Sequence, residues 1–472
     1  MIRKSNPEFI APYLKDASNF SGGNAEEVII PENSEELVDF LKSETRPVTI
    51  AGAGTGLTAS RIPSEGVIVS LEKLNKIEIG EEGKIQVGPA VTLNELQGFL
   101  KSTSWFYPPN PTETWASLGG TLATNASGAR SYKYGVTRDY VTEVELVLVD
   151  GRKTIVQRGI KITEPLKFED GSQISFPEIS YQSPNCKNAA GYYVHPGMEW
   201  LDLFIGSDGT LCIFTNIGLR LSNRPANFVS GILFFDDERT CWDLIPKIKS
   251  YTGNKIAPCS LEYFDQNALK KLKGKHQNIP HNSRAALFFE QDIAQLQDYD
   301  LVMENWYDFL SEENIMLDES WFAQDAKDIQ KFHEFRHDIP IIINEENSRA
   351  GRVKLGTDMA VPDKHFIPMM EFYQQTLREN TLDYVMFGHL GDNHLHINLL
   401  PNDSQMDEAQ KVYDQMVEQV LNWKGTVSAE HGIGKLKKKY FAKMVGLDGL
   451  KDLKKIKDCF DPDNRLGAGN IL

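Results

Sequence analysis

The sequence predicts an α+β fold with more than one domain. The chain has 472 residues, which is longer than a single hydrophobic core normally supports. Short β-branched runs alternate with helical patterns, and turn residues cluster around 222–225. We therefore expect one domain over residues 1–222 and a second over 223–472.

The first domain is expected to contain several short strands and a helix. Grouped aliphatic and β-branched residues predict strands over 48–50, 67–71, 85–87 and 144–149. Apolar residues at helical spacing predict a helix over 93–100.

The second domain is expected to combine longer helices with strands. Helical patterns cover 291–310 and 323–335, and strand-like runs cover 231–235, 384–387 and 394–400. The last stretch, from residue 428, holds a short glycine motif and a Lys-rich helix. We expect it to fold back toward the first domain.

The charge and the cysteines exclude several classes of protein. With 50 basic and 66 acidic residues the net charge is −16, which argues against a nucleic-acid-binding protein. The five cysteines form no CxxC pair, so iron–sulfur clusters and thiolate zinc sites are not expected. Scattered thiols and the absence of an apolar leader favour the cytoplasm, with peripheral membrane association left open.

A glycine loop follows the strand at 48–50. Alternating glycines let successive backbone N–H groups point into one concavity, which suits a pyrophosphate. The Rossmann pattern would need glycine where this chain has Leu57. The candidate ligand-binding residues are Gly52, Ala53, Gly54, Thr55, Gly56, Leu57 and Thr58, and a glycine-rich turn without a ligand is the alternative.

Two further segments are rich in glycine and small residues, at 108–139 and 206–213. Small side chains allow a large flat ligand to approach the backbone. The candidates in these segments are Pro111, Thr112, Gly119, Gly120, Thr124, Asn125, Gly128, Gly135, Gly209 and Ile213.

Four histidines lie in two short polar stretches, at 388–398 and 428–434. Strand alternation places His394, His396 and Asn398 on one face, and a turn at 391–393 can bring His389 back to it. Paired imidazoles with a carboxylate are a common set of transition-metal ligands. The alternative is that each histidine is satisfied by backbone hydrogen bonds on a buried strand.

The three glycine-rich segments, in this order and separation, resemble the FAD-binding domain of the vanillyl-alcohol-oxidase flavoprotein superfamily. The C-terminal half is similar to its FAD-linked D-2-hydroxy-acid dehydrogenase branch. That branch includes D-lactate and D-2-hydroxyglutarate dehydrogenases and the FAD subunit of glycolate oxidase. The resemblance implies a two-subdomain FAD-binding domain over 1–222 and an α+β substrate (cap) domain over 223–472, with a C-terminal segment returning to the flavin.

The resemblance also assigns the cofactor. The loop at 52–58 would hold the FAD pyrophosphate, and 119–128 and 209–213 would line the rest. Some members attach FAD through a histidine in or just after this loop, but residues 57–60 contain none. We therefore expect non-covalent FAD.

The resemblance implies a metal site and a base. Matched to G-H-x-G-D-G-N-x-H and E-H-G-x-G, His389, His396 and Glu430 become ligands of a divalent metal and His431 the catalytic base. Zinc is expected first, with manganese or iron as alternatives. The chain departs from the pattern at Asn393 and at His394, which is either a fourth ligand or a substrate contact.

Substrate binding needs a cation for the carboxylate of a 2-hydroxy acid, and arginine offers bidentate geometry. Arg336 stands where family members place such an arginine. Lys354 lies two residues before the usual family lysine, a position that Gly356 takes here. Asn398 is a further candidate contact. In the lysine run at 435–439 only Lys437 matches a family position, and an exposed helix face is the simplest interpretation.

The expected reaction is oxidation of a small D-2-hydroxy acid to the 2-oxo acid, with hydride transfer to the flavin. Three alternatives remain: a metal-independent flavoenzyme of the alkyl-dihydroxyacetone-phosphate synthase type, a zinc hydrolase whose glycine loops are structural, and a flavin-binding subunit without turnover. The sequence leaves open which acid is oxidised, whether the electron acceptor is a quinone, an electron-transfer flavoprotein or a partner subunit, and whether the protein is a homodimer.

Overall fold

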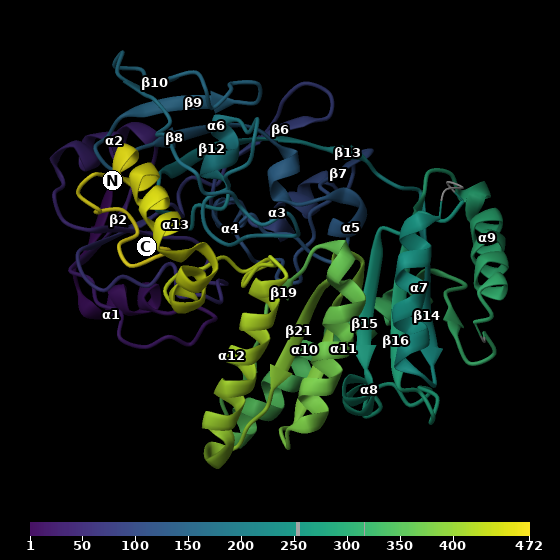
Figure 1. The fold of residues 1–472 in the computed structure, drawn as a ribbon. Coiled ribbons are helices and arrows are strands. Elements are labelled where there is room, and N and C mark those ends of the chain that lie inside the picture. The colour runs from purple at the N-terminus through teal and green to yellow at the C-terminus, as the bar shows by residue number, and fades with distance from the viewer. Residues whose placement is uncertain (252–254, 316) are drawn as a thin grey trace.

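The computed structural model describes residues 1–251, 255–315 and 317–472 and shows an α+β architecture, as predicted (Figure 1). The N-terminal part forms a sheet of order β1-β2-β4-β3, in which β2, β4 and β3 are parallel. Helix α2 (Ser34–Ser43) connects β2 to β3 and buries Leu37, Phe40 and Leu41. The strands are β1 (Ile2–Lys4), β2 (Glu27–Ile30), β3 (Val48–Ala51) and β4 (Val67–Ser70).

A second sheet in this half is antiparallel, with the order β5-β6-β12-β8-β9. Helix α3 (Leu93–Leu100) covers the predicted residues and begins with a capping box between Thr92 and Glu95. The strands are β5 (Ile77–Ile79), β6 (Lys84–Val87), β8 (Val141–Val147), β9 (Lys153–Gln157) and β12 (Ile213–Arg220).

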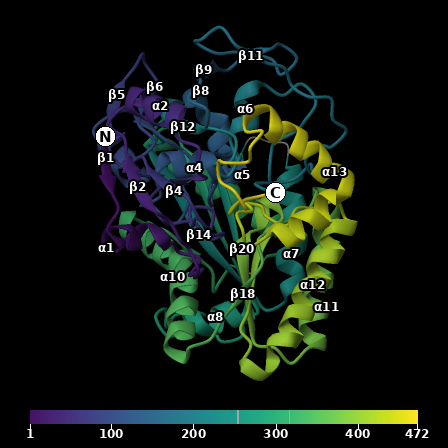
Figure 2. The same ribbon diagram turned by 90° about the vertical axis from the view of Figure 1, so that its left-hand side faces the viewer.

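The C-terminal half is built on one large sheet of order β17-β14-β16-β15-β20-β21-β18, with β19 also paired to β21. Figure 2 shows helices on both faces of this sheet. Its strands are β14 (Asn227–Phe235), β15 (Ser260–Asp265), β16 (Ala285–Ile293), β17 (Trp321–Phe322), β18 (Leu355–Gly356), β19 (Met359–Ala360), β20 (Tyr384–His389) and β21 (His394–Leu399).

Alternation along these strands creates two cores. Leu233 and Met386 pack with helices α7 (Glu238–Ser250), α11 (Phe366–Glu379) and α12 (Met406–Asn422) on one face. Their neighbours Ile232 and Val385 pack with α8 (Gln266–Leu272) and α10 (Ala326–Ala350) on the other. The second face, which α10 covers, also carries the candidate site.

Shorter elements complete the chain. They are α1 (Pro7–Ile10), β7 (Trp105–Phe106), α4 (Leu118–Thr124), α5 (Ser131–Tyr134), β10 (Leu166–Lys167), β11 (Gln173–Ile174), α6 (Trp200–Phe204), β13 (Ser222–Asn223), α9 (Tyr299–Glu312) and α13 (Lys438–Phe460).

Two helix predictions in the second half are wrong in their bounds. Residues 291–293 end strand β16, because they pair with 227–229 of β14, and α9 begins only at Tyr299. The predicted helix over 323–335 is α10, which continues to Ala350 and contains Pro340. Buried Phe335, Ile339 and Ile343 continue its apolar face past the proline, so packing compensates for the lost backbone hydrogen bond.

The C-terminal segment, drawn in yellow in Figure 1, returns to the first half, where Leu466 forms a bridge with Val48 of β3. Val48 donates its backbone N–H to Arg465, and the Gly467 N–H donates back to Val48. The buried Lys457 ammonium donates to the Thr210 carbonyl at 2.7 Å. These contacts hold the C-terminus against the β3 strand and the 206–213 segment.

A buried ion pair connects the two halves. Arg130 Nε lies 3.1 Å from Glu290 Oε2, on β16. Burial alone would raise the pKa of Glu290, but Arg130 and His333 lower it to about 2, so the carboxylate is charged at neutral pH. Across the described residues, no helix combines the length and the apolar character needed to cross a membrane.

Candidate active site

One cavity joins the glycine-rich segments of the first half to the histidine cluster of the second. Its volume is about 1800 Å³. A pocket for one small ligand usually measures roughly 300–1,000 Å³, so this cavity has room for a cofactor and a substrate together. The wall is formed by 52–58 and parts of 119–128 and 208–213 from the first half, and by parts of 336–358, 387–398 and 430–437 from the second.

Most of the predicted cofactor residues line this cavity. They are Gly52, Ala53, Gly54, Thr55, Gly56, Leu57, Thr58, Pro111, Thr112, Gly119, Gly120, Thr124, Gly128, Gly209 and Ile213. A Cβ added to Gly56 or Gly209 would meet no protein atom within 4 Å. The chain therefore leaves open space at these two glycines, as a bound flavin nucleotide requires.

Other glycines are needed for packing of the protein itself. A Cβ on Gly128 would lie 2.3 Å from the Asn110 carbonyl oxygen, and one on Gly119 would lie 2.7 Å from Pro89 Cβ. Here the absence of a side chain allows two backbone segments to approach, which the sequence does not distinguish from space for a ligand.

Two of the predicted cofactor residues, Asn125 and Gly135, do not line the cavity. Asn125 ends α4 in the left-handed conformation, with φ 48°, and its Oδ1 accepts the Arg138 N–H at 3.0 Å. Gly135 has φ 79° and turns the chain beside Asp139. Both residues shape the backbone behind the wall.

The β20–β21 hairpin builds the histidine cluster. Phe387 pairs with His396, and the turn over Leu390–Asp392 ends at Asn393, with φ 53°. This turn returns His389 to the side of the strand that carries His394 and His396, as the sequence predicts. The ligand atoms of His389, His394, His396 and Glu430 all lie within 4.8 Å of one another. Nitrogen and carboxylate ligands at about 2 Å from a shared ion lie at most about 4 Å apart, so small movements of these side chains would let them bind one ion.

Hydrogen bonds orient the two imidazoles that the sequence assigns to the metal. His389 Nδ1 lies 2.7 Å from Glu262 Oε1, and its Nε2 faces Glu430 Oε1 at 3.3 Å. His396 Nδ1 lies 3.3 Å from the Thr357 carbonyl oxygen, and its Nε2 is 3.9 Å from Glu430 Oε2. Both rings thus present Nε2 to Glu430, while Nδ1 lies near an oxygen atom, as is usual for metal-ligating histidines.

A metal binds neutral imidazole and ionised carboxylate, and the pKa values of His396 and Glu430 favour these forms. Burial, with the neighbouring His394 and His431, holds the pKa of His396 well below its usual range. Burial opposes ionisation of Glu430, but Lys187 and His389 hold its pKa well below normal. His389 differs: burial lowers its pKa, yet Glu262 and Glu430 raise it to about 9, so a metal must displace its proton.

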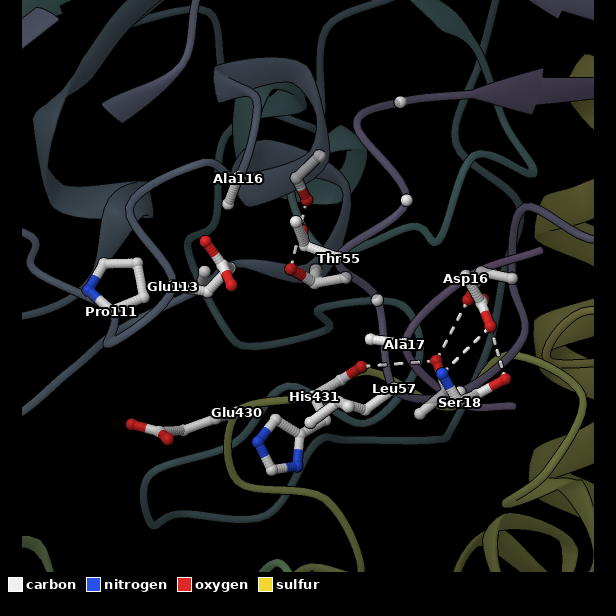
Figure 3. Close-up of a pocket in the computed structure, with 18 of the residues that line it drawn as sticks. Asp16, Ala17, Ser18, Thr55, Leu57, Pro111, Glu113, Ala116, Glu430 and His431 are labelled. Atoms are coloured by element: carbon white, nitrogen blue, oxygen red, sulfur yellow. Dashed lines mark hydrogen bonds between the residues drawn. The ribbon is translucent and has the colours of Figure 1, made fainter. Parts of the chain in front are cut away.

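His431 lies between this cluster and the glycine loop. Figure 3 shows it beside Leu57, and Thr58 Oγ1 donates to its carbonyl oxygen at 3.4 Å. Its Nδ1 is 3.0 Å from Asp358 Oδ2. His431 also lines the cavity, so Asp358 fixes one ring nitrogen and leaves Nε2 to face a ligand.

Asp358 is a residue whose role the sequence does not reveal. Its side chain is 1% exposed and accepts hydrogen bonds from Ser428 Oγ at 2.8 Å and Lys437 Nζ at 2.6 Å. Burial would raise the pKa of Asp358, but His431 and Lys437 hold it well below normal, so the residue is a carboxylate. Lys437 is therefore a partly buried partner of this carboxylate and not part of an exposed helix face.

Lys187 is the second such residue. Its buried ammonium donates to Glu430 Oε1 at 2.7 Å and to Asp392 Oδ2 at 3.2 Å. Ser127, from the predicted flavin segment, also donates to Glu430 Oε1, at 2.6 Å. Glu430, in the second half of the chain, is thus held by two groups from the first half. Lys187 lies in an irregular segment that no periodicity highlights.

Three predicted substrate residues line the cavity, and one does not. Arg336 Nε is 3.2 Å from Glu262 Oε2. Burial would raise the pKa of Glu262, but His389 and Arg336 lower it to about 2. Lys354 and Asn398 also face the cavity. His394 is fully buried behind the wall, with Nε2 2.9 Å from Asp358 Oδ1. His394 therefore does not line the cavity, and its place in the cluster favours the ligand role over the substrate contact.

Comparison with known proteins identifies both halves. The family model "FAD linked oxidases, C-terminal domain" matches residues 224–471, and "FAD binding domain" matches 25–156. Glycolate oxidase subunit GlcD of Bacillus subtilis is 28% identical over 98% of this chain and 92% of its own length. D-lactate dehydrogenase of Anaerostipes hadrus is 27% identical, over 97% and 92%. D-2-hydroxyglutarate dehydrogenase of Stutzerimonas stutzeri is 24% identical, over 98% and 94%.

Among solved structures, alkyldihydroxyacetonephosphate synthase has a similar fold, with a TM-score of 0.69 and 13% identity over 98% of this chain and 81% of that chain. This likeness concerns the fold, which is that of the vanillyl-alcohol-oxidase flavoproteins. The C-terminal match spans more than half of the chain, and the FAD-binding match precedes it. The chain therefore belongs to the family of FAD-linked oxidases and is an FAD-binding oxidoreductase.

Proposed function

We propose that this protein oxidises a small D-2-hydroxy acid to the 2-oxo acid, using non-covalent FAD and a divalent metal. The observation that carries the proposal is the single cavity shared by the flavin-binding segments, the His389–His396–Glu430 cluster and His431. Relatives named D-lactate dehydrogenase and D-2-hydroxyglutarate dehydrogenase support the class of substrate.

The residues present fit both groups. The open space at Gly56 and Gly209 suits the nucleotide, and residues 57–60 offer no histidine for a covalent link. FAD, when bound, accepts the hydride that leaves C2 of the acid. His389, His396 and Glu430 would hold the metal, with His394 as a fourth ligand and zinc as the first expectation. A bound metal supplies positive charge beside the substrate oxygens, worth several kcal/mol in such sites.

The side chains of the chain perform the remaining steps. Arg336 binds the substrate carboxylate through its terminal nitrogens, because Glu262 holds the guanidinium at Nε. His431 removes the hydroxyl proton at Nε2. The Asp358 carboxylate keeps the ring in the orientation that exposes Nε2 and stabilises the imidazolium that forms.

The arrangement disfavours the alternative functions. A metal-independent enzyme of the synthase type has no use for four converging ligand atoms behind the flavin loops. A hydrolase without flavin disagrees with the FAD-binding match over 25–156. Reduced flavin must pass its electrons on, and a quinone, an electron-transfer flavoprotein or a partner subunit would each serve.

Anaerobic mixing of the FAD-loaded, zinc-loaded protein with paired D- and L-2-hydroxy acids tests the proposal. We expect the visible absorption of oxidised flavin to disappear with D-acids and to persist with the L-enantiomers, because Arg336, His431 and the flavin define one face for hydride transfer. Retention of the oxidised spectrum with every acid would refute the proposed function.

A further inference from the structure

The two oxygens of the Glu430 carboxylate have different surroundings. Oε1 accepts hydrogen bonds from Lys187 Nζ at 2.7 Å and from Ser127 Oγ at 2.6 Å. A carboxylate oxygen offers about two lone pairs, so these two donors occupy Oε1. From residues 1–251, 255–315 and 317–472, no hydrogen bond reaches Oε2. Oε2 is therefore the oxygen that remains for a metal ion.

Both oxygens nevertheless lie beside predicted ligand nitrogens. Oε1 is 3.3 Å from His389 Nε2, and Oε2 is 3.9 Å from His396 Nε2. Without the two donors on Oε1, the carboxylate would be placed to bind an ion with both oxygens. Lys187 and Ser127 thus compete with the metal for one oxygen of Glu430.

Lys187 is itself fixed by its surroundings. Its side chain is 5% exposed, and its ammonium group donates to Glu430 Oε1, to Ser131 Oγ at 2.9 Å and to Asp392 Oδ2 at 3.2 Å. An ammonium group has three N–H donors, so each of them has an acceptor. Lys187 does not line the cavity, whereas Glu430 does. Lys187 therefore acts on the site through Glu430 and not by touching a substrate.

The number of oxygens that Glu430 gives to the metal decides whether a substrate can reach the ion. With His394 included, the cluster offers four protein ligands. Zinc in proteins usually has four ligands and sometimes expands to five in catalytic sites. A second oxygen from Glu430 would fill the fifth position, which a substrate oxygen needs.

We propose that Lys187 is a positioning residue that holds Glu430 as a monodentate metal ligand and so keeps a coordination position open for the substrate. Ser127, from the predicted flavin segment, assists by donating to the same oxygen. The inference rests on the proposed function and adds to it a residue that determines how the metal is held.

Crystal structures of the FAD-loaded, zinc-loaded protein and of its Lys187→Met variant test this inference. Methionine is similar to lysine in length but has no donor. In the wild-type protein we expect zinc about 2.0–2.2 Å from Oε2 alone, with Lys187 still on Oε1. In Lys187→Met we expect both oxygens at bonding distance and an unchanged zinc content, because the released oxygen adds a ligand. Lys133→Met removes an ion pair with Asp292 outside the cavity and should leave the coordination as in the wild type.

Titration of the flavin absorption with oxamate measures the open position without turnover. Oxamate is an unreactive acid with neighbouring carboxylate and carbonyl oxygens. We expect its Kd to rise at least tenfold in Lys187→Met and to stay the same in Lys133→Met, since loss of a group that holds a metal ligand typically costs 10–100-fold in affinity or activity. Unchanged oxamate binding in Lys187→Met would overturn the inference.

The structures separate this inference from the proposed function. Zinc bound by both oxygens of Glu430 in the wild type, or by one oxygen in Lys187→Met, would overturn the role of Lys187 and leave the proposed function intact. Loss of zinc from Lys187→Met would also overturn it, because Lys187 would then be needed for any metal binding. Wild-type protein with FAD but no zinc at His389, His396 and Glu430 would refute the metal of the proposed function, and this inference with it. The wild-type structure is decisive whatever the stability of the variant.

Discussion

Substitution of His431 by alanine is expected to slow flavin reduction by roughly 10²–10⁴-fold, the range typical of losing a positioned proton acceptor. Asp358 holds Nδ1 of this ring at 3.0 Å, so the wild-type ring presents Nε2 to the cavity. Substrate binding should change much less, because Arg336 and the metal provide the anchoring. Stopped-flow measurement of flavin reduction separates the two effects.

The neighbouring Glu430 makes metal and FAD content essential controls for this variant. His281→Ala is a matched control, because His281 is exposed and outside the cavity. A His431→Ala protein that keeps both groups and reduces flavin at nearly the wild-type rate would show that another residue takes the proton.

Removal of the divalent metal is expected to reduce turnover at least a hundredfold, since several kcal/mol of charge stabilisation would be lost. Added zinc or manganese should restore it. His396→Ala should weaken metal binding while FAD remains bound, because His396 lies on β21 and not in the glycine-rich segments. Dialysis against a chelator, followed by elemental analysis and activity measurement, checks both expectations.

The FAD content of the chelated protein must be measured in the same experiment. Protein that has been treated with the chelator must still contain FAD, since loss of the flavin alone would abolish turnover. Full activity in protein shown to be free of metal would contradict the assignment of His389, His396 and Glu430.

Local patterns in the sequence were sufficient for much of the fold and for one part of the site. The alternation over 394–398 and the turn at 391–393 predict that His389, His394 and His396 converge, and the hairpin brings them together. These residues are close in sequence, so strand geometry alone determines how their side chains lie relative to one another.

Partners from distant segments could not be predicted in this way. Asp358, Glu262 and Lys187 each reach the site from a different part of the chain, and a single sequence does not show which face of a strand or loop is buried. The same limit applies to Asn125 and Gly135, which turn the backbone at positive φ and do not line the cavity.

The sequence pattern also does not predict the full extent of helix α10. A proline normally ends a helical pattern, and the pattern over 323–335 places Arg336 just after a helix. Burial of Ile339 and Ile343 in the core of the large sheet holds the helix together beyond Pro340. Tertiary packing thus decides the length of the helix.

The central claim is that flavin and metal share one cavity that His431 lines. Anomalous diffraction at the zinc edge, from crystals of the FAD-loaded and zinc-loaded protein, tests it most directly. The account predicts an anomalous peak about 2.0–2.2 Å from ligand atoms of His389, His396 and Glu430, in the same cavity as a flavin ring lying against residues 52–58. A flavin in place with no peak at these residues, or with the peak elsewhere, would contradict it.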